Sequence, residues 1–259
     1  MVGRFWAWAL LGPALLSTHA AAADADNLLL ALKRARTLAV RGQAQVTVNF
    51  PPRNSPTRLA AQLPAVAVRP GLLERAFTVA QAGTAQVAGR ATVRYDLTPR
   101  NPDAPRWTLW IDTAWNLPLA YEERRSDGEL ARRAVFVKVN STLARVSRPV
   151  PAAPAGLRAA LLRAMPGVRL PAGFVPVAVT RQGDRWNVAL SDGVNVLALV
   201  AAARGVEAAP GVVSRPVEGG FVWLVGNLPQ RALEAALAGV RGLRPAALGT
   251  FVTPADSNP

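Results

Sequence analysis

Residues 90–139 restrict the fold of this chain more than any other part of the sequence. Near the middle of this stretch, Trp107, Leu109 and Ile111 recur at every second position. Successive side chains of a β-strand point to opposite faces, so these three residues share one face and Trp110 lies on the other. Large side chains on both faces predict a strand that is covered on both sides.

Two further strands are predicted at residues 119–125 and 130–139, which completes a three-stranded antiparallel meander. Asn116 lies in the first connecting turn and tolerates a left-handed backbone. Asp127 and Gly128 form the second turn, and this pair is typical of the two positive-φ positions of a tight hairpin.

Residues 1–23 have the features of a secretory signal peptide: Arg4, an apolar segment at 5–16 and a run of alanines before the cleavage site. The apolar segment has about 12 residues, which is too short to span a bilayer. An uncleaved anchor is the alternative. We expect an exported protein that is peripheral to the membrane and does not span it.

The remainder of the N-terminal half predicts an antiparallel sheet with one helix. Asp24 and Asp26 are N-cap candidates for a helix over residues 27–38. Alternation predicts strands at residues 42–50 and 85–95, and residues 63–69 are a candidate for a short strand after the proline-rich loop 51–64.

A proline- and alanine-rich segment at residues 147–155 is the best candidate for a linker. The helix that follows carries Leu157, Leu161 and Met165 on one face. Strands and a final helix then predict a small α+β unit. The expected organisation is a signal peptide (1–23), an N-terminal domain (24–146), a linker and helix (147–167), a C-terminal domain (168–242) and a flexible tail (243–259).

The composition argues against an enzyme. The chain has no cysteine, and its one histidine, His19, lies in the expected signal peptide. This excludes thiol and Ser-His-Asp catalysis and the usual zinc sites. We therefore predict no catalytic residue, no metal site and no cofactor. The net charge of +14 comes almost wholly from arginine and indicates either an acidic partner or ordinary solvated faces.

Two groups of residues are candidates for binding. A concave sheet lined by large apolar side chains can hold an acyl chain, although core packing explains such side chains equally well. The candidates for a ligand cavity are Trp107, Leu109, Trp110, Ile111 and Trp115. Four arginines flank the 127–128 turn and are candidates for binding an acidic peptide or lipid head groups, unless they form a solvated face: Arg124, Arg125, Arg132 and Arg133.

Several motifs occur in the order found in one known family. They are Leu109-Trp-Ile-Asp, Asn116-Leu-Pro-Leu, Ser126-Asp-Gly-Glu, Leu170-Pro-Ala-Gly-Phe, Ser191-Asp-Gly and Gly226-Asn-Leu-Pro. With these motifs the chain resembles the RseB/MucB family, periplasmic regulators of the envelope-stress factor sigma-E. The chain has Trp115-Asn116 where the family usually has Thr-Gly, and residues 50–80 match poorly and look shortened.

The resemblance implies an α+β fold. Its N-terminal domain would be an open antiparallel β-barrel like the carriers LolA and LolB, with helices in the concave face. A smaller C-terminal antiparallel sheet would pack against a helix. The implied function is to bind the extracytoplasmic segment of an anti-sigma factor in the periplasm and to shield it from proteolysis, until a lipid or lipoprotein ligand releases it.

Other functions are weighed against this one. A LolA-type periplasmic lipid or lipoprotein carrier predicts the same open barrel but has no need for a second domain, so the C-terminal unit favours the regulator. An envelope hydrolase is disfavoured by the missing histidine and cysteine. Nucleic-acid binding is disfavoured by the export signal, so no nucleic acid is expected as a partner.

Overall fold

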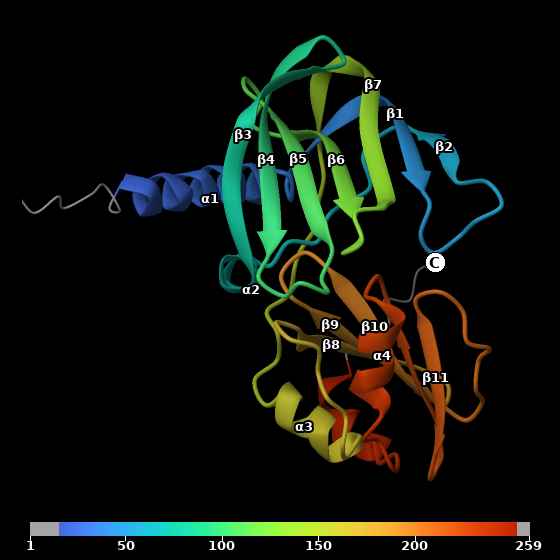
Figure 1. Cartoon of the computed structure of the whole chain (residues 1–259). Helices are drawn as coiled ribbons and strands as arrows, with labels where there is room; N and C mark the ends of the chain where they lie inside the picture. The colour runs from blue at the N-terminus through green and yellow to red at the C-terminus, as the bar shows by residue number, and fades with distance from the viewer. Residues whose placement is uncertain (1–15, 253–259) are drawn as a thin grey trace, which may run out of the picture.

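Two antiparallel sheets make up most of the described structure (Figure 1). This computed structural model describes residues 16–252. The first sheet has the strand order β2-β1-β7-β6-β5-β4-β3. Its edge strands β2 and β3 do not pair with each other, so the sheet is open and forms no closed barrel. The strands are β1 (Leu38–Val48), β2 (Thr57–Ala60), β3 (Phe77–Val87), β4 (Arg90–Pro99), β5 (Arg106–Asp112), β6 (Pro118–Arg124) and β7 (Leu130–Arg145).

Two helices accompany this sheet, α1 (Leu16–Arg34) and α2 (Pro70–Ala76). Leu28 and Leu32 of α1 are buried against the inner face of the sheet, in one core with Leu109 and Phe136. Figure 1 shows α1 passing behind the sheet, with its first turns projecting beyond β3. The hydrophobic core of the N-terminal half therefore lies between α1 and the inner face of the seven-stranded sheet.

The prediction for the first helix was wrong at both of its ends. The helix α1 begins before the two expected capping aspartates and ends at Arg34, so the strand β1 already starts at Leu38. Asp24 caps no helix; its carboxylate accepts a hydrogen bond from the backbone N–H of Gln81 at 2.8 Å. The expected signal peptide is a prediction whose residues 1–15 lie outside the described residues.

Two strand predictions were also wrong. No strand forms at residues 63–69, and β2 lies instead within the loop predicted at 51–64. The single strand predicted at 85–95 is a hairpin of β3 and β4, because Ala88 and Gly89 adopt positive φ angles of 50° and 75°. An Ala-Gly pair lacks the Asn-Gly or Asp-Gly signature of such turns, so the alternation hid the reversal.

The predicted meander of β5, β6 and β7 is confirmed. Asn116 has the expected positive φ of 51°, and Gly128 has a φ of 91°. Asp127 has no positive φ; its carboxylate instead accepts a hydrogen bond from the backbone N–H of Glu129 at 3.0 Å. Trp107 is buried on the inner face of β5, whereas the outer face is polar, and Trp110 is only half-buried there. The prediction that β5 is covered on both sides therefore holds for the inner face and only in part for the outer face.

The second sheet has the order β11-β12-β10-β9-β8. Its core contains Leu157, Leu161 and Met165, as the apolar stripe predicted. The strand at 212–217 was not predicted. The prediction of a flexible tail from residue 243 was wrong for residues 243–252, because a 3-10 helix there packs on the second sheet with Leu248 completely buried. The elements are α3 (Leu157–Ala164), β8 (Val175–Gln182), β9 (Arg185–Ser191), β10 (Val196–Ala202), β11 (Val212–Val217), β12 (Gly220–Val225), α4 (Gln230–Leu237) and the 3-10 helix η1 (Pro245–Phe251).

The two sheets meet at the turn between β9 and β10. The backbone N–H of Arg69, just before α2, donates to the Gly193 carbonyl at 2.8 Å. Gly193 has a φ of +119°, and a Cβ at this position would clash with the backbone nitrogen of Leu73. The next residue, Val194, packs into the core of the first sheet. Only glycine therefore allows α2 to approach this turn so closely.

A buried ion pair fixes the turn between β5 and β6. The Arg90 guanidinium donates to both carboxylate oxygens of Asp112, at 2.6 and 3.0 Å, and stacks 3.4 Å from the Trp115 ring centroid. Asp112 is 1% exposed. Burial alone would raise the pKa of Asp112, but the bonds from Arg90 and from the Trp115 and Ala114 backbone N–H groups outweigh it and lower that pKa.

We expect Asp112→Asn to lower the free energy of unfolding by about 1.5–3 kcal/mol, because it removes charge-assisted bonds but keeps an oxygen for the turn. The pKa of Asp112 in the folded state lies below its unfolded value of about 3.9, so this stabilisation is present above about pH 4. It is lost as the pH falls through the folded-state pKa. Urea unfolding at a series of pH values measures both effects.

Asp127→Asn is the control, because Asp127 pairs with Arg125 at the surface, where such pairs contribute at most about 1 kcal/mol. An Asp112→Asn effect no larger than that of the control, or one that persists unchanged at acid pH, contradicts the stabilising role of the buried pair.

Gly193→Ala should destabilise the contact between the sheets by about 2–5 kcal/mol, from the left-handed backbone together with the clash at Leu73. Thermal unfolding and limited proteolysis of the 146–156 connection measure this loss. Gly128→Ala is the matched control, since Gly128 also has a positive φ but a Cβ added there would meet no atom within 4 Å. The control should lose only about 1–2 kcal/mol, and equal losses would refute the close contact as the cause.

Candidate ligand cavity and partner-binding cleft

The inner face of the seven-stranded sheet contains a cavity of about 190 Å³, here called the sheet cavity. Its walls come from the end of α1, the start of β1, the segment that follows β2, and the middle of the sheet. Most of the lining is apolar. The lining residues are Leu32, Ala35, Arg36, Leu38, Ala39, Val40, 62–68, Leu109, Leu117, Pro118, Tyr121, Phe136 and 148–150.

Positive charge gathers at the rim of the sheet cavity. Arg36 donates to the Val68 carbonyl at 2.8 Å, and Arg148 donates to the side-chain oxygen of Gln62 at 3.1 Å. Both acceptors are neutral, and no carboxylate lines this cavity. Partial burial and the nearby charge of Arg36 lower the pKa of Arg69. The rim therefore has a positive potential that suits an anionic group.

A second hollow of about 350 Å³, here called the inter-domain cleft, lies between the two sheets. One wall is formed by β1 and the loop after it, and the opposite wall by β10, β11 and β12. Val196 of β10 is 53% exposed there. The lining residues are Val46, Val48, Phe50, Pro51, Arg53, Arg58, Pro64, Pro105, Tyr121, Glu123, Arg132, Asn195, Val196, Leu197, Gly211, Val212, Val225, Gly226 and Asn227.

The floor of the inter-domain cleft is a polar network around Glu123. This carboxylate is 3% exposed; it pairs with Arg132 and accepts a hydrogen bond from the Asn227 amide at 2.7 Å. The Arg132 guanidinium also lies 5.2 Å from the Trp107 ring centroid. Arg132 comes from the same sheet as Glu123, whereas Asn227 follows β12 of the second sheet. The buried Glu123 carboxylate therefore links the two halves through its hydrogen bond with Asn227.

Asn195 is the second link across the cleft. Its side-chain oxygen accepts a hydrogen bond from the Trp107 indole at 2.8 Å, and its amide donates to Asp192 at 2.7 Å. Burial raises the pKa of Asp192, and the hydrogen bonds from Asn195 and Val194 offset part of this effect. The turn after β9 thus presents Asn195 to the first sheet in a fixed orientation.

The five predicted cavity residues do not lie together. Leu109 lines the sheet cavity, whereas Trp107 and Ile111 are buried in the first core. Trp110 lies on the outer face of the sheet, and Trp115 stacks on Arg90 at the β5–β6 turn. The alternation identified the buried face of β5 correctly but did not show which of its residues border a cavity.

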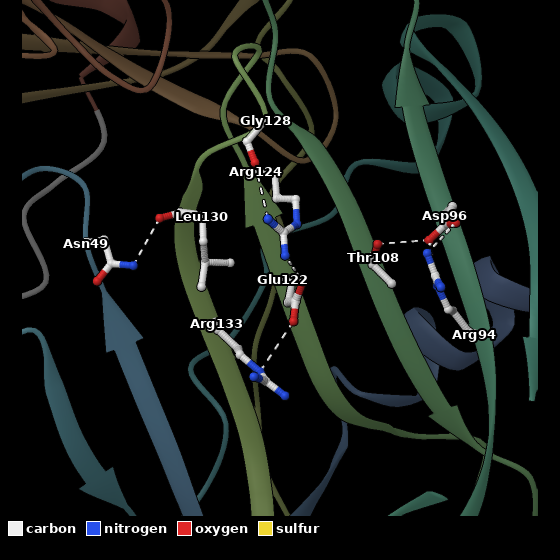
Figure 2. Close-up of polar contacts among 9 residues, drawn as sticks. All are labelled: Asn49, Arg94, Asp96, Thr108, Glu122, Arg124, Gly128, Leu130 and Arg133. Atoms are coloured by element: carbon white, nitrogen blue, oxygen red, sulfur yellow. Dashed lines mark hydrogen bonds and ion pairs between the residues drawn. The ribbon is translucent and has the colours of Figure 1, made fainter. Parts of the chain in front are cut away.

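The four predicted partner-binding arginines do not form one patch. Arg124 and Arg133 share Glu122 on the outer face of the sheet, with N–O distances of 3.1 and 3.4 Å. Figure 2 shows this pairing beside the Arg94–Asp96 pair and Thr108. Arg125 pairs with Asp127 at the hairpin turn, and Arg132 points into the inter-domain cleft. Neighbouring strand residues face opposite sides, which separates Arg132 from Arg133.

Sequence reasoning missed the polar residues that line the inter-domain cleft, as well as Tyr121, which lines both hollows. Tyr121 and Glu123 lie on β6, whereas Asn195 and Asn227 come from the second half of the chain, more than 70 positions away. Glu123 gave the only usable signal, because it lies next to Glu122 on a strand and must face the opposite side. The partners of Glu123 depend on how the second sheet docks, and alternation within one strand carries no information about that docking.

Residues 16–252 contain no group of three carboxylate or histidine side chains that suits a metal ion. No helix in the same part of the chain is long and apolar enough to cross a membrane.

Comparisons with known proteins place the fold. Solved structures of MucB match with TM-scores of 0.59–0.60 at 17–20% sequence identity. The match to a crystal structure of MucB covers 85% of this chain and 98% of the MucB chain. The match to the complex structure of Pseudomonas aeruginosa MucA/MucB covers 86% of this chain and 99% of the matched chain. The match to MucB in complex with MucA(peri) covers 85% of this chain and 100% of the matched chain. At this identity the similarity establishes the fold. No curated protein sequence matches the chain.

The family model of the MucB/RseB N-terminal domain matches residues 28–153. These residues contain α1 from Leu28 onward, the whole seven-stranded sheet and the sheet cavity. The match confirms the resemblance that the ordered motifs indicated. The N-terminal domain of this chain therefore belongs to the MucB/RseB family.

Proposed function

We propose that this protein is an exported, non-enzymatic regulator that binds the extracytoplasmic segment of an anti-sigma factor in the periplasm. The observation that carries the proposal is the similarity over both sheets to MucB, which has been solved in complex with MucA. The open sheet and its apolar cavity alone would support a lipid carrier equally well. The second sheet, which a carrier does not need, favours the regulator.

The inter-domain cleft is the proposed binding site for the partner. Its walls offer apolar side chains, including the exposed Val196, to the apolar residues of an extended segment. Arg53 and Arg58 supply positive charge beside these walls. The Asn227 amide and the Glu123 carboxylate form the polar floor between these walls. A segment with acidic and apolar residues fits these features.

The sheet cavity is the proposed site of a lipid or lipoprotein ligand. Its volume lies below the roughly 300–1,000 Å³ of typical small-molecule pockets, so it suits one acyl chain better than a whole lipid. Each buried methylene contributes about 0.8 kcal/mol. Arg36 and Arg148 at the rim would attract an anionic head group. The open sheet with helices at its inner face is also compatible with the half-closed barrel of LolA and LolB.

The main alternative is a LolA-type carrier of lipids or lipoproteins. The apolar lining of the sheet cavity favours it, because a carrier and a lipid-responsive regulator need the same cavity. The two functions differ at the inter-domain cleft, which has no role in a carrier. A test of the cleft therefore separates them.

If the protein is the regulator, one membrane protein should dominate its crosslinked partners in cells, and a substitution in the inter-domain cleft should reduce capture of that protein. Crosslinking in cells, followed by mass spectrometry, should capture a single-span membrane protein with a cytoplasmic sigma-binding domain. Val196→Asp places a buried charge against the bound segment and should reduce this capture by about tenfold or more, equal to about 1.4 kcal/mol or more.

Val137→Asp is the matched control, because Val137 is equally exposed, at 51%, but lies on β7 outside the cleft. It should leave the capture unchanged. Recovery of many lipoproteins without any single-span protein would reject the regulator and support the carrier.

Filling the sheet cavity should prevent binding of an acyl chain. Ala35 is half-buried and lines the cavity, so Ala35→Phe occupies the space that the chain would take. We expect calorimetry with dodecanoate to show binding to the wild-type protein and at least a tenfold loss in the variant, about 1.4 kcal/mol. Ala159→Phe, an exposed change on α3, should bind as the wild type does. Equal binding by all three proteins would place the ligand elsewhere.

A further inference from the structure

The sheet cavity and the inter-domain cleft share one wall. Pro64 and Tyr121 line both of them. Tyr121 is 3% exposed, so its ring is enclosed between the two hollows and is not a surface group. A change in the position of either side chain therefore alters the shape of both hollows at once.

The ring of Tyr121 is also connected to the floor of the cleft. Its centroid lies 5.6 Å from that of Trp107, with the two planes tilted by 48°. Trp107 donates its indole N–H to Asn195 of the second sheet, and the Arg132 guanidinium lies 5.2 Å from the Trp107 ring centroid. A displaced Tyr121 ring would therefore press on the Trp107 indole, which forms the hydrogen bond with Asn195.

The second half of the shared wall is held by side-chain packing and, among the described residues, by no hydrogen bond of its own. Residues 63–67, here called the strap, form no helix or strand. The strap is anchored just outside its ends, where Gly42 N–H donates to the Ala61 carbonyl and Arg36 donates to the Val68 carbonyl. Within residues 16–252, no hydrogen bond holds residues 63–67 themselves. Leu63 anchors the start of the strap in the first core, but Ala65 and Ala67 are exposed, so a local movement of the rest breaks few interactions.

We infer that the strap and Tyr121 couple the two hollows, so that an acyl chain in the sheet cavity displaces this wall into the inter-domain cleft and reduces the space for the partner segment. The inference rests on the proposed function, for which it supplies a physical route from lipid binding to partner release. By linkage, a bound partner segment then weakens binding of the acyl chain by the same factor.

The chain has no cysteine, so a single nitroxide label can report on the cleft without background. Val196→Cys places this label at an exposed position of the cleft wall. Dodecanoate is the probe for the sheet cavity, and Ala35→Phe fills the cavity without any ligand. In both cases the electron paramagnetic resonance spectrum of the label should shift to slower motion, because the displaced wall crowds the cleft.

Variants of the wall test the route itself. Tyr121→Leu shortens the shared side chain and should abolish the shift caused by Ala35→Phe. Pro64→Ala changes the half-buried strap residue, leaves the core intact and should reduce the shift, which provides a test even if Tyr121→Leu does not fold. Ala159→Phe on α3 should leave the spectrum of the label unchanged.

The outcomes separate this inference from the function on which it rests. A folded Ala35→Phe protein with an unchanged spectrum overturns the coupling, whether or not dodecanoate binds. A shift that survives both wall variants overturns the route through Tyr121 and Pro64. If dodecanoate fails to bind while Ala35→Phe still shifts the spectrum, the lipid part of the proposed function fails and the coupling stands.

Discussion

The hydrogen bond between the Trp107 indole and the Asn195 side chain is the contact on which the arrangement of the molecule depends. It joins residues 88 positions apart, Trp107 on β5 and Asn195 in the turn between β9 and β10, and both groups are buried. Leaving either group without a partner costs about 1–3 kcal/mol, so the sheets are strongly favoured to dock in the register that makes the bond. The Glu123–Asn227 hydrogen bond is a second contact between the two halves, and the residues of both contacts except Trp107 line the inter-domain cleft.

Local patterns in the sequence predicted much of the fold. Alternation identified the buried face of β5, and the turn residues Asn116 and Gly128 took the backbone conformations that their chemistry favours. The failures have equally local causes. Ala88-Gly89 forms a tight turn without the usual signature, and the strap runs between the buried side chains of Leu63 and Val68 without the hydrogen bonds of a strand. At the Ala88-Gly89 turn and in the strap, tertiary packing determines a backbone conformation that the local sequence does not specify.

The candidate site was much less predictable than the fold. Whether an apolar residue borders a cavity or only fills the core depends on the elements that pack over it, and for Leu109 these include α1 and the segment after β2. The arginines illustrate the same limit: their order in the sequence suggested a patch, but the strand geometry sends Arg132 and Arg133 to opposite faces. Among the four arginines, Arg132 alone lines the inter-domain cleft.

The missing hydrogen bonds of the strap also have a consequence for where the molecule opens first. Local opening that breaks few bonds is cheaper than global unfolding and occurs far more often. Within the described part of the chain, opening of the strap breaks no hydrogen bond of residues 63–67 and withdraws only Leu63 and Val66 from the first core, so both sheets can stay intact. Ligand entry to the sheet cavity then needs the free energy of a local fluctuation that withdraws Leu63 from the core, which is a smaller cost than unfolding the sheet.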